Sequence, residues 1–150
     1  MKQVILVLLI VAGSIMQAQE IEKRQDGYYR NGQLFTGTHE TFYENGNLKL
    51  SRTFVRGQEE GISRYYFENG SMKEERVWSN GKKHGVWATW NEKGLKTAEA
   101  GYENDKKHGK WYIWDENQVL RYEMQYEQGV KTGTWFMWDE NGKLLEEKDH

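Results

Sequence analysis

Large hydrophobic residues recur along this chain at a fixed interval of 24 residues. One aromatic series consists of Phe54, Trp78, Tyr102 and Tyr126. A glycine series keeps the same step at Gly37, Gly61, Gly85, Gly109 and Gly133. A constant period of this length is typical of a repeat protein in which each repeat is one supersecondary unit. We therefore predict five repeats, near residues 28–53, 54–77, 78–101, 102–125 and 126–150.

Each repeat contains two segments with the signature of β-strands. The first segment has the pattern Gly-x-Trp-x-x-Trp in its best copies, which supply the pairs Trp87 and Trp90, Trp111 and Trp114, and Trp135 and Trp138. Residues 44–46, 68–70 and 140–142 then read Glu-Asn-Gly, which favours a hairpin turn because Asn and Gly tolerate positive φ. Glycine every few residues argues against helix.

The pattern predicts an all-β fold, an elongated single-layer antiparallel sheet of stacked hairpins. A lone hairpin cannot bury its aromatic residues, but stacked copies can. Neighbouring strands lie roughly 4.8 Å apart, so about ten strands would form a ribbon roughly 45 Å long. Trp87 and Trp90 are three positions apart and should point to opposite faces of the sheet.

Some positions depart from the repeat. Gln118 replaces a glycine at a turn, and we expect the adjacent Asn117 to take the left-handed conformation instead. The phase also slips after Gly94, and a bulge near Gly101 would restore it. Residues 80–85 read as a glycine-rich loop between repeats. His39 and Ser63 stand at positions that hold tryptophan in later repeats.

The repeated residues resemble the bacterial variant of the MORN repeat. Residues 78–90 and 102–114 carry the similarity most clearly, with an aromatic residue, a turn followed by Lys-Lys-His-Gly, and then Trp-x-x-Trp. Residues 28–37 also resemble the first unit of the YwqK-family antitoxins. The resemblance implies a β-hairpin array that binds proteins, or in some members lipid, without catalysis.

The first 18 residues have the pattern of a cleaved secretory signal peptide. Lys2 precedes an apolar run from position 4 to position 16, and Ala18 offers a small residue at the cleavage site. The alternative is a membrane anchor, but the run is shorter than the roughly 20 residues of a membrane-spanning helix. We predict an exported chain, periplasmic or secreted, with no transmembrane span after cleavage and an N-terminal extension at residues 19–27.

Composition limits the chemistry that the chain can carry. The absence of cysteine leaves no disulfide, no thiolate and no site for a bacterial lipid anchor. The formal net charge of −2 is dispersed and argues against nucleic acid binding, which favours a concentrated basic surface. His84 and His108 share a repeat position but would lie roughly 10 Å apart, too far for one metal ion. We expect no cofactor and no metal.

A row of glutamates could be mistaken for paired catalytic carboxylates. Its members are Glu44, Glu68, Glu92, Glu116 and Glu140. A catalytic pair needs two unlike environments, whereas these residues share one turn position. We therefore expect solvated turn residues and a protein that is not an enzyme.

The repeated aromatic residues are candidates either for the core or for partner binding. The predicted structural positions are Gly61, Gly85, Gly109, Gly133, Trp78, Tyr102, Tyr126, Trp90, Trp114 and Trp138. The candidate partner-binding residues are Trp87, Trp111, Trp135, Lys83 and Lys107. We predict an exported scaffold that binds a partner protein through one aromatic, glycine-rich face. A toxin-neutralising antitoxin or immunity protein, and a binder of envelope glycan or lipid, remain alternatives.

Overall fold

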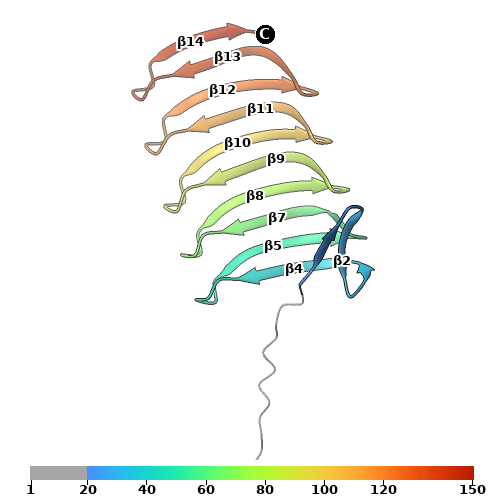
Figure 1. The fold of residues 1–150 in the computed structure, drawn as a ribbon. Coiled ribbons are helices and arrows are strands. Elements are labelled where there is room, and N and C mark those ends of the chain that lie inside the picture. Colours follow the sequence, from blue (N-terminus) through green and yellow to red (C-terminus); the bar gives the residue numbers. More distant parts are fainter. Residues whose placement is uncertain (1–19) are drawn as a thin grey trace, which may run out of the picture.

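The computed structural model describes residues 20–150, which form strands and turns (Figure 1). The predicted signal peptide, residues 1–18, lies outside the described residues. The strands are β1 (Glu22–Arg24), β2 (Gly27–Arg30), β3 (Gln33–Leu34), β4 (Gly37–Phe42), β5 (Leu48–Val55), β6 (Gln58–Glu59), β7 (Gly61–Tyr66), β8 (Met72–Ser79), β9 (Lys82–Trp90), β10 (Lys96–Glu103), β11 (Lys106–Trp114), β12 (Leu120–Glu127), β13 (Val130–Trp138) and β14 (Leu144–Asp149). In this part of the chain no helix is long and apolar enough to cross a membrane.

Eleven of these strands form one antiparallel sheet in which neighbours in the chain are neighbours in space. The order runs from β4 and β5 through β7 and onward to β14, and the two-residue β6 pairs with β5 beside β7. Figure 1 shows the hairpins stacked in sequence order, with arched strands and no closure between the first and last. The predicted all-β sheet of consecutive hairpins is therefore confirmed.

Two-residue turns join the hairpins along one side of the sheet. Asn80 and Gly81 both have positive φ, 50° and 72°, and connect the paired residues Ser79 and Lys82. This conformation matches the twist of the strands and is the favoured two-residue hairpin turn. The predicted loop at residues 80–85 is therefore wrong, because the loop ends at Gly81 and Lys82 already pairs in β9.

The Glu-Asn-Gly turns join the hairpins along the other side, as predicted. In the first of them the Tyr43 N–H donates to Asn47 O at 2.8 Å, and the Gly46 N–H donates to Tyr43 O at 3.0 Å. At the position without glycine, Gln118 itself takes the left-handed conformation with φ 64°. The expectation that Asn117 would do so is wrong. The Gln118 side chain instead donates to Lys96 O at 3.0 Å, which ties the turn to the preceding repeat.

A bulge interrupts the pairing of β10 with β11 between Ala100 and Tyr102. This confirms the bulge predicted near Gly101. The backbone of β11 approaches so closely here that a Cβ on Gly101 would lie 2.0 Å from His108 O. Only glycine fits this position without a shift of one strand.

The N-terminal residues form a separate three-stranded sheet, β1–β2–β3, that lies against the first hairpins (Figure 1). The Tyr28 N–H donates to Gly57 O at 2.9 Å, and the Gly57 N–H donates to Phe35 O at 2.7 Å. Tyr28 and Phe35 pack on Phe54, with ring centroids 4.7 and 5.6 Å away, and Phe54 is fully buried. The predicted repeat boundary at residue 28 therefore falls inside β2, which pairs with β1 and β3.

Candidate binding face

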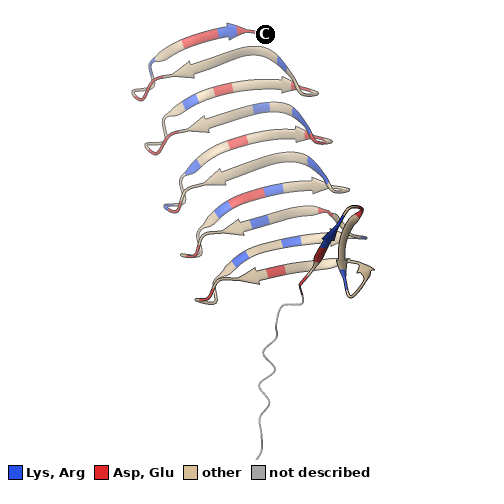
Figure 2. Ribbon diagram, in the orientation of Figure 1, with Lys and Arg blue, Asp and Glu red and all other residues tan. Residues whose placement is uncertain are grey.

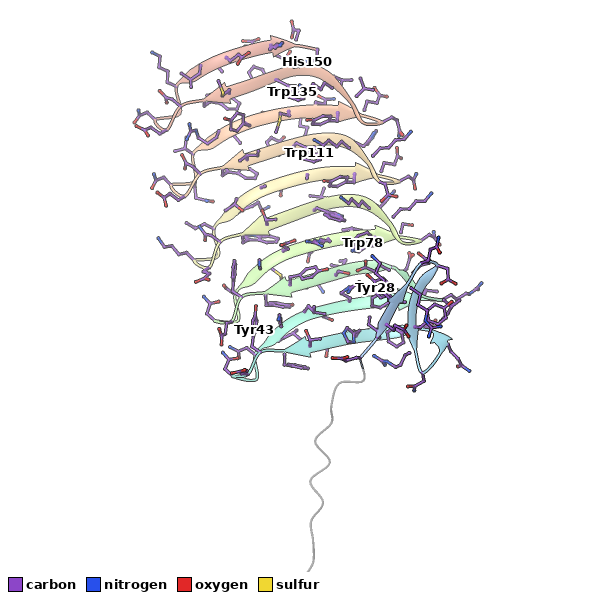
Figure 3. All side chains as sticks on the ribbon, in the orientation of Figure 1. Tyr28, Tyr43, Trp78, Trp111, Trp135 and His150 are labelled. Atoms are coloured by element: carbon purple, nitrogen blue, oxygen red, sulfur yellow. The ribbon has the colours of Figure 1, made fainter. Side chains whose placement is uncertain are left out.

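Seven aromatic rings form a continuous ladder across the strands from β8 to the C-terminus. Successive ring centroids lie 4.5 to 5.4 Å apart and every pair is tilted. Tilted contacts of this kind bring a ring edge toward its neighbour's face, which stabilises the pair beyond area burial. The members are Trp78, Trp87, Tyr102, Trp111, Tyr126, Trp135 and His150, of which Figure 3 labels four. We call the side of the sheet that carries them the ladder face.

Three tryptophans of the ladder are also fixed by hydrogen bonds. The indole N–H groups donate to backbone carbonyls of the preceding strand. The bonds run from Trp87 to Val77 O at 2.8 Å, from Trp111 to Gly101 O at 2.9 Å and from Trp135 to Gln125 O at 3.1 Å. A bonded and stacked indole has a structural role whether or not a partner is present. The partner-binding role predicted for these tryptophans stays a prediction.

Lysines lie over the rings of the ladder. The ammonium groups of Lys83, Lys107 and Lys131 lie 4.9, 4.3 and 4.3 Å from the centroids of Trp87, Trp111 and Trp135. Each such cation–π contact contributes about 0.5 to 1 kcal/mol of stabilisation at an exposed site. The predicted residues Lys83 and Lys107 are thus brought together with the predicted tryptophans on one face, and Lys131 extends their row.

The ladder changes character in the second repeat, where Ser63 stands in the tryptophan position and is 1 % exposed. Arg52 Nε donates to Glu59 Oε1 at 2.9 Å, and Ser63 Oγ lies 3.3 Å from the same oxygen. Burial alone would lower the pKa of Arg52, but the hydrogen bond and the charge of Glu59 raise it. The guanidinium packs over Tyr28 and Phe54, so this polar cluster fills the space left by the missing tryptophan.

Apolar side chains surround the ladder over the later strands. Ile113 pairs with Tyr122, Tyr122 pairs with Met137, and Met124 pairs with Trp111 across neighbouring strands. Ile113 and Tyr122 are each 39 % exposed. Tyr122, Met124, Trp135 and Met137 also line a shallow hollow of about 210 Å³, together with Glu146 and Lys148 of β14. These apolar residues were not among the predicted site residues, although their two-residue spacing in β11, β12 and β13 places them on one face.

The opposite face carries the second aromatic of each Trp-x-x-Trp pair. Trp114 stacks on Tyr112 and Trp138 stacks on Phe136, with centroids 5.6 Å apart in each pair. Since Tyr112 is adjacent to Trp111 in the strand, Trp111 and Trp114 lie on opposite faces, as the spacing predicts. Trp90, Trp114 and Trp138 are half-buried and have no ladder of their own.

The charged groups of the opposite face are paired with one another. Lys110 contacts Glu123 at 2.6 Å, Arg64 contacts Glu75 at 3.0 Å, and Lys96 forms an ion pair with Glu99. These contacts neutralise three positive charges on that side. The two faces of the sheet therefore differ in electrostatics as well as in packing.

The histidines considered as metal ligands lie in strands, and the glutamates considered as catalytic groups lie in turns. His84 and His108 lie in β9 and β11 rather than in loops, and residues 20–150 hold no group of three or more His, Asp or Glu that could bind a metal ion. The five turn glutamates are all exposed and share one edge of the sheet, so they have the like environments expected of solvated turn residues.

Four segments of the chain match the model of the MORN repeat variant family, residues 35–55, 59–80, 107–128 and 131–150. Between the second and third matches, the hairpin of β9 and β10 continues the same pairing and the same aromatic ladder. A comparison with curated proteins finds no match. The similarity of residues 28–37 to YwqK-family antitoxins stays a prediction. Because the matched segments together cover more than half of the sequence, the chain belongs to the MORN repeat variant family.

Proposed function

We propose that this protein is an exported, non-catalytic scaffold that binds a partner protein on the ladder face of β9–β13. The observation that carries the proposal is the surface formed by Ile113, Tyr122, Met124 and Met137 beside the ladder. Ile113 and Tyr122 are exposed, and Met124 and Met137 are half-buried beside them. A continuous apolar surface of this kind is typical of interaction sites. The hollow between them gives an anchor side chain of a partner a place to insert.

The MORN repeat family is consistent with a scaffold that has no catalytic role. Each repeat places the same residue types in the same surroundings, whereas catalysis needs groups with unlike environments. Aromatic and methionine side chains, in contrast, are the residues enriched at protein interfaces. Binding therefore fits the repeated composition of the face.

Export is proposed on the pattern of residues 1–18, with a mature chain that begins near residue 19. Fractionation of cells that produce the full chain, followed by N-terminal sequencing, tests this step. We expect the protein outside the cytoplasm with its first residues removed. Full-length protein retained in the cytoplasm would contradict export and leave the binding proposal to be judged separately.

Binding is tested by capture from the envelope and secreted fractions of the source cells on immobilised residues 20–150, which contain every strand of the structure. We expect one protein in stoichiometric amount, lost when Tyr122→Ser and Met137→Ser are combined. Val86→Ser is the matched control, since Val86 is 54 % exposed and pairs with Gly101, away from the ladder rings. Equal capture by all variants would contradict the proposal. If the captured protein is toxic alone and harmless in the complex, the scaffold acts as an immunity protein.

A further inference from the structure

The lysines of the ladder face lack acidic partners. Within residues 20–150, no carboxylate lies within 4 Å of the ammonium groups of Lys83, Lys107 or Lys131, whereas those of Lys96 and Lys110 on the opposite face each have one. The Asp105 carboxylate near Lys83 accepts instead from the Lys83 backbone N–H at 2.9 Å. The ladder lysines rest on tryptophan rings and keep their ammonium groups available. Their charge is therefore left for an external anion.

Within β9–β13 the residues around these lysines add no negative charge on the same face. On the flanking strands, Glu74 of β8 is paired with Arg76, and Glu146 of β14 lines the hollow together with Lys148. Across β9–β13, strands that the structure describes in full, the pairing brings to this face Thr89, Ala98, Ala100, Ile113, Tyr122, Met124 and Met137 besides the ladder and its lysines. The acidic residues Glu99 and Glu123 of the same strands point to the other side, where they pair with Lys96 and Lys110. The ladder face thus combines a row of positive charge with an apolar row.

The geometry sets the spacing that a ligand would need. Lys83, Lys107 and Lys131 lie on β9, β11 and β13, so successive lysines are about 10 Å apart and the row is about 20 Å long. An α-helix of about 14 residues covers this length, with carboxylates about seven positions apart. An extended segment would cover it with a carboxylate at about every third residue.

Resting on the proposed function, we infer that the ladder face of β9–β13 binds an acidic segment of its partner protein. Carboxylates of that segment contact Lys83, Lys107 and Lys131, and its apolar side chains enter the hollow between Tyr122 and Met137. The ordering of the two rows fixes the direction in which the segment lies, across the strands and along the ladder.

An anionic membrane would offer the same charge but fits the face less well. Figure 2 shows acidic residues in the turns on both sides of the sheet. One side carries Glu92, Glu116 and Glu140, and the other carries Glu103 and Asp105 next to Lys82 and Lys106. A broad anionic surface would meet the glutamates of the first side, whereas a single segment along the ladder meets the row of lysines. Repulsion at the first side therefore favours a peptide over a lipid surface.

The test is panning of a displayed library of random 16-residue peptides against residues 20–150. We expect enriched peptides to be acidic and to contain large apolar residues. Synthetic copies should bind about tenfold more weakly to the triple variant Lys83→Gln, Lys107→Gln and Lys131→Gln, because three exposed ion pairs are lost. The matched control is Arg64→Gln, Lys96→Gln and Lys110→Gln, which removes the same charge from the opposite face and should leave affinity unchanged. Circular dichroism and thermal unfolding establish that both variants are folded.

Several results would overturn the inference. They are no enrichment, enrichment of neutral or basic peptides, equal weakening by both triple variants, or preferential binding to vesicles of phosphatidylcholine and phosphatidylserine. The proposed function fails separately. If the lysine variant retains the captured partner and only the Tyr122→Ser and Met137→Ser variant loses it, partner binding on the ladder face is supported. The inference of an acidic segment is then contradicted.

Discussion

Arg52 Nε donates to Glu59 Oε1 at 2.9 Å, and Ser63 Oγ lies 3.3 Å from the same oxygen. Later repeats place a lysine and a tryptophan at the repeat positions of Glu59 and Ser63. Glu59 is one period before Lys83, and Ser63 is one period before Trp87. The side chains of Arg52 and Glu59 are only 16 % and 9 % exposed. The second repeat thus has a buried ion pair in place of an aromatic contact. The Arg52 guanidinium of this pair also packs over the ring of Tyr28 in the N-terminal sheet.

We expect Glu59→Ala to lower the free energy of unfolding by about 3 kcal/mol, because it leaves the Arg52 charge buried without a partner. The double variant Arg52→Met and Glu59→Met should lose less, about 1 kcal/mol, since no charge remains to be buried. Urea unfolding followed by tryptophan fluorescence measures both. A double variant that loses as much stability as Glu59→Ala would contradict the unpaired buried charge as the cause of the loss.

The two tryptophans of each first strand should differ in their effect on stability. Trp111→Ala removes a hydrogen bond to Gly101 O and ring contacts with Tyr102 and Tyr126 at 5.2 and 5.4 Å, so we expect a loss of about 3 kcal/mol. Trp114→Ala removes one ring contact, with Tyr112, and should cost about 1 kcal/mol. Thermal unfolding of the two variants ranks them, and a larger loss for Trp114 would contradict the ladder as the main support of the sheet.

The sequence predicted the repeated hairpins well because its signals are local. Gly-rich turns, the period of 24 and the alternation of strand residues all act within one or two strands. The bulge at Gly101 could be predicted for the same reason, since one repeat is out of phase with its neighbours. Opposite placement of Trp111 and Trp114 needs only the two-residue period of a strand.

The sequence did not predict which aromatic residues form the ladder on one face of the sheet. Both aromatic series repeat every 24 residues, and periodicity alone does not say which series forms the ladder. Lys83 and Trp87 share a face by strand alternation, and the contacts of Trp87 with Trp78 and Tyr102 identify that face as the one with the ladder. The N-terminal sheet was missed because residues 28–37 have the spacing of a repeat, and only their contacts with Phe54 and Gly57 set them apart.

Gly101 should be among the least replaceable glycines of the sheet. Gly101→Ala would place a methyl group 2.0 Å from His108 O, so the strands must separate, and we expect a loss of about 3 kcal/mol. Gly94→Ala is the control, because its Cβ would meet open space and only the positive φ of 78° adds strain, about 1 kcal/mol. Chemical denaturation compares the two. Similar losses would show that the close approach at the bulge relaxes easily.

His39 should make stability depend on pH. It is 8 % exposed, and burial lowers its pKa, with a further lowering by Arg30 and Arg52 that Glu20 opposes. The unfolded chain, with a pKa near 6.5, therefore binds a proton on acidification before the folded chain does. Stability from this residue is complete above about pH 6.5 and falls as the pH decreases below it.

Replacing His39 with glutamine removes this titration while keeping a polar side chain. We expect the free energy of unfolding of His39→Gln to change less between about pH 7.5 and pH 5 than that of the parent protein. Urea unfolding at several pH values in this window measures the difference. His84→Gln is the control, because it makes the same substitution at an exposed position of β9. An identical slope in His39→Gln and the parent would mean that the folded protein protonates His39 as readily as the unfolded chain does.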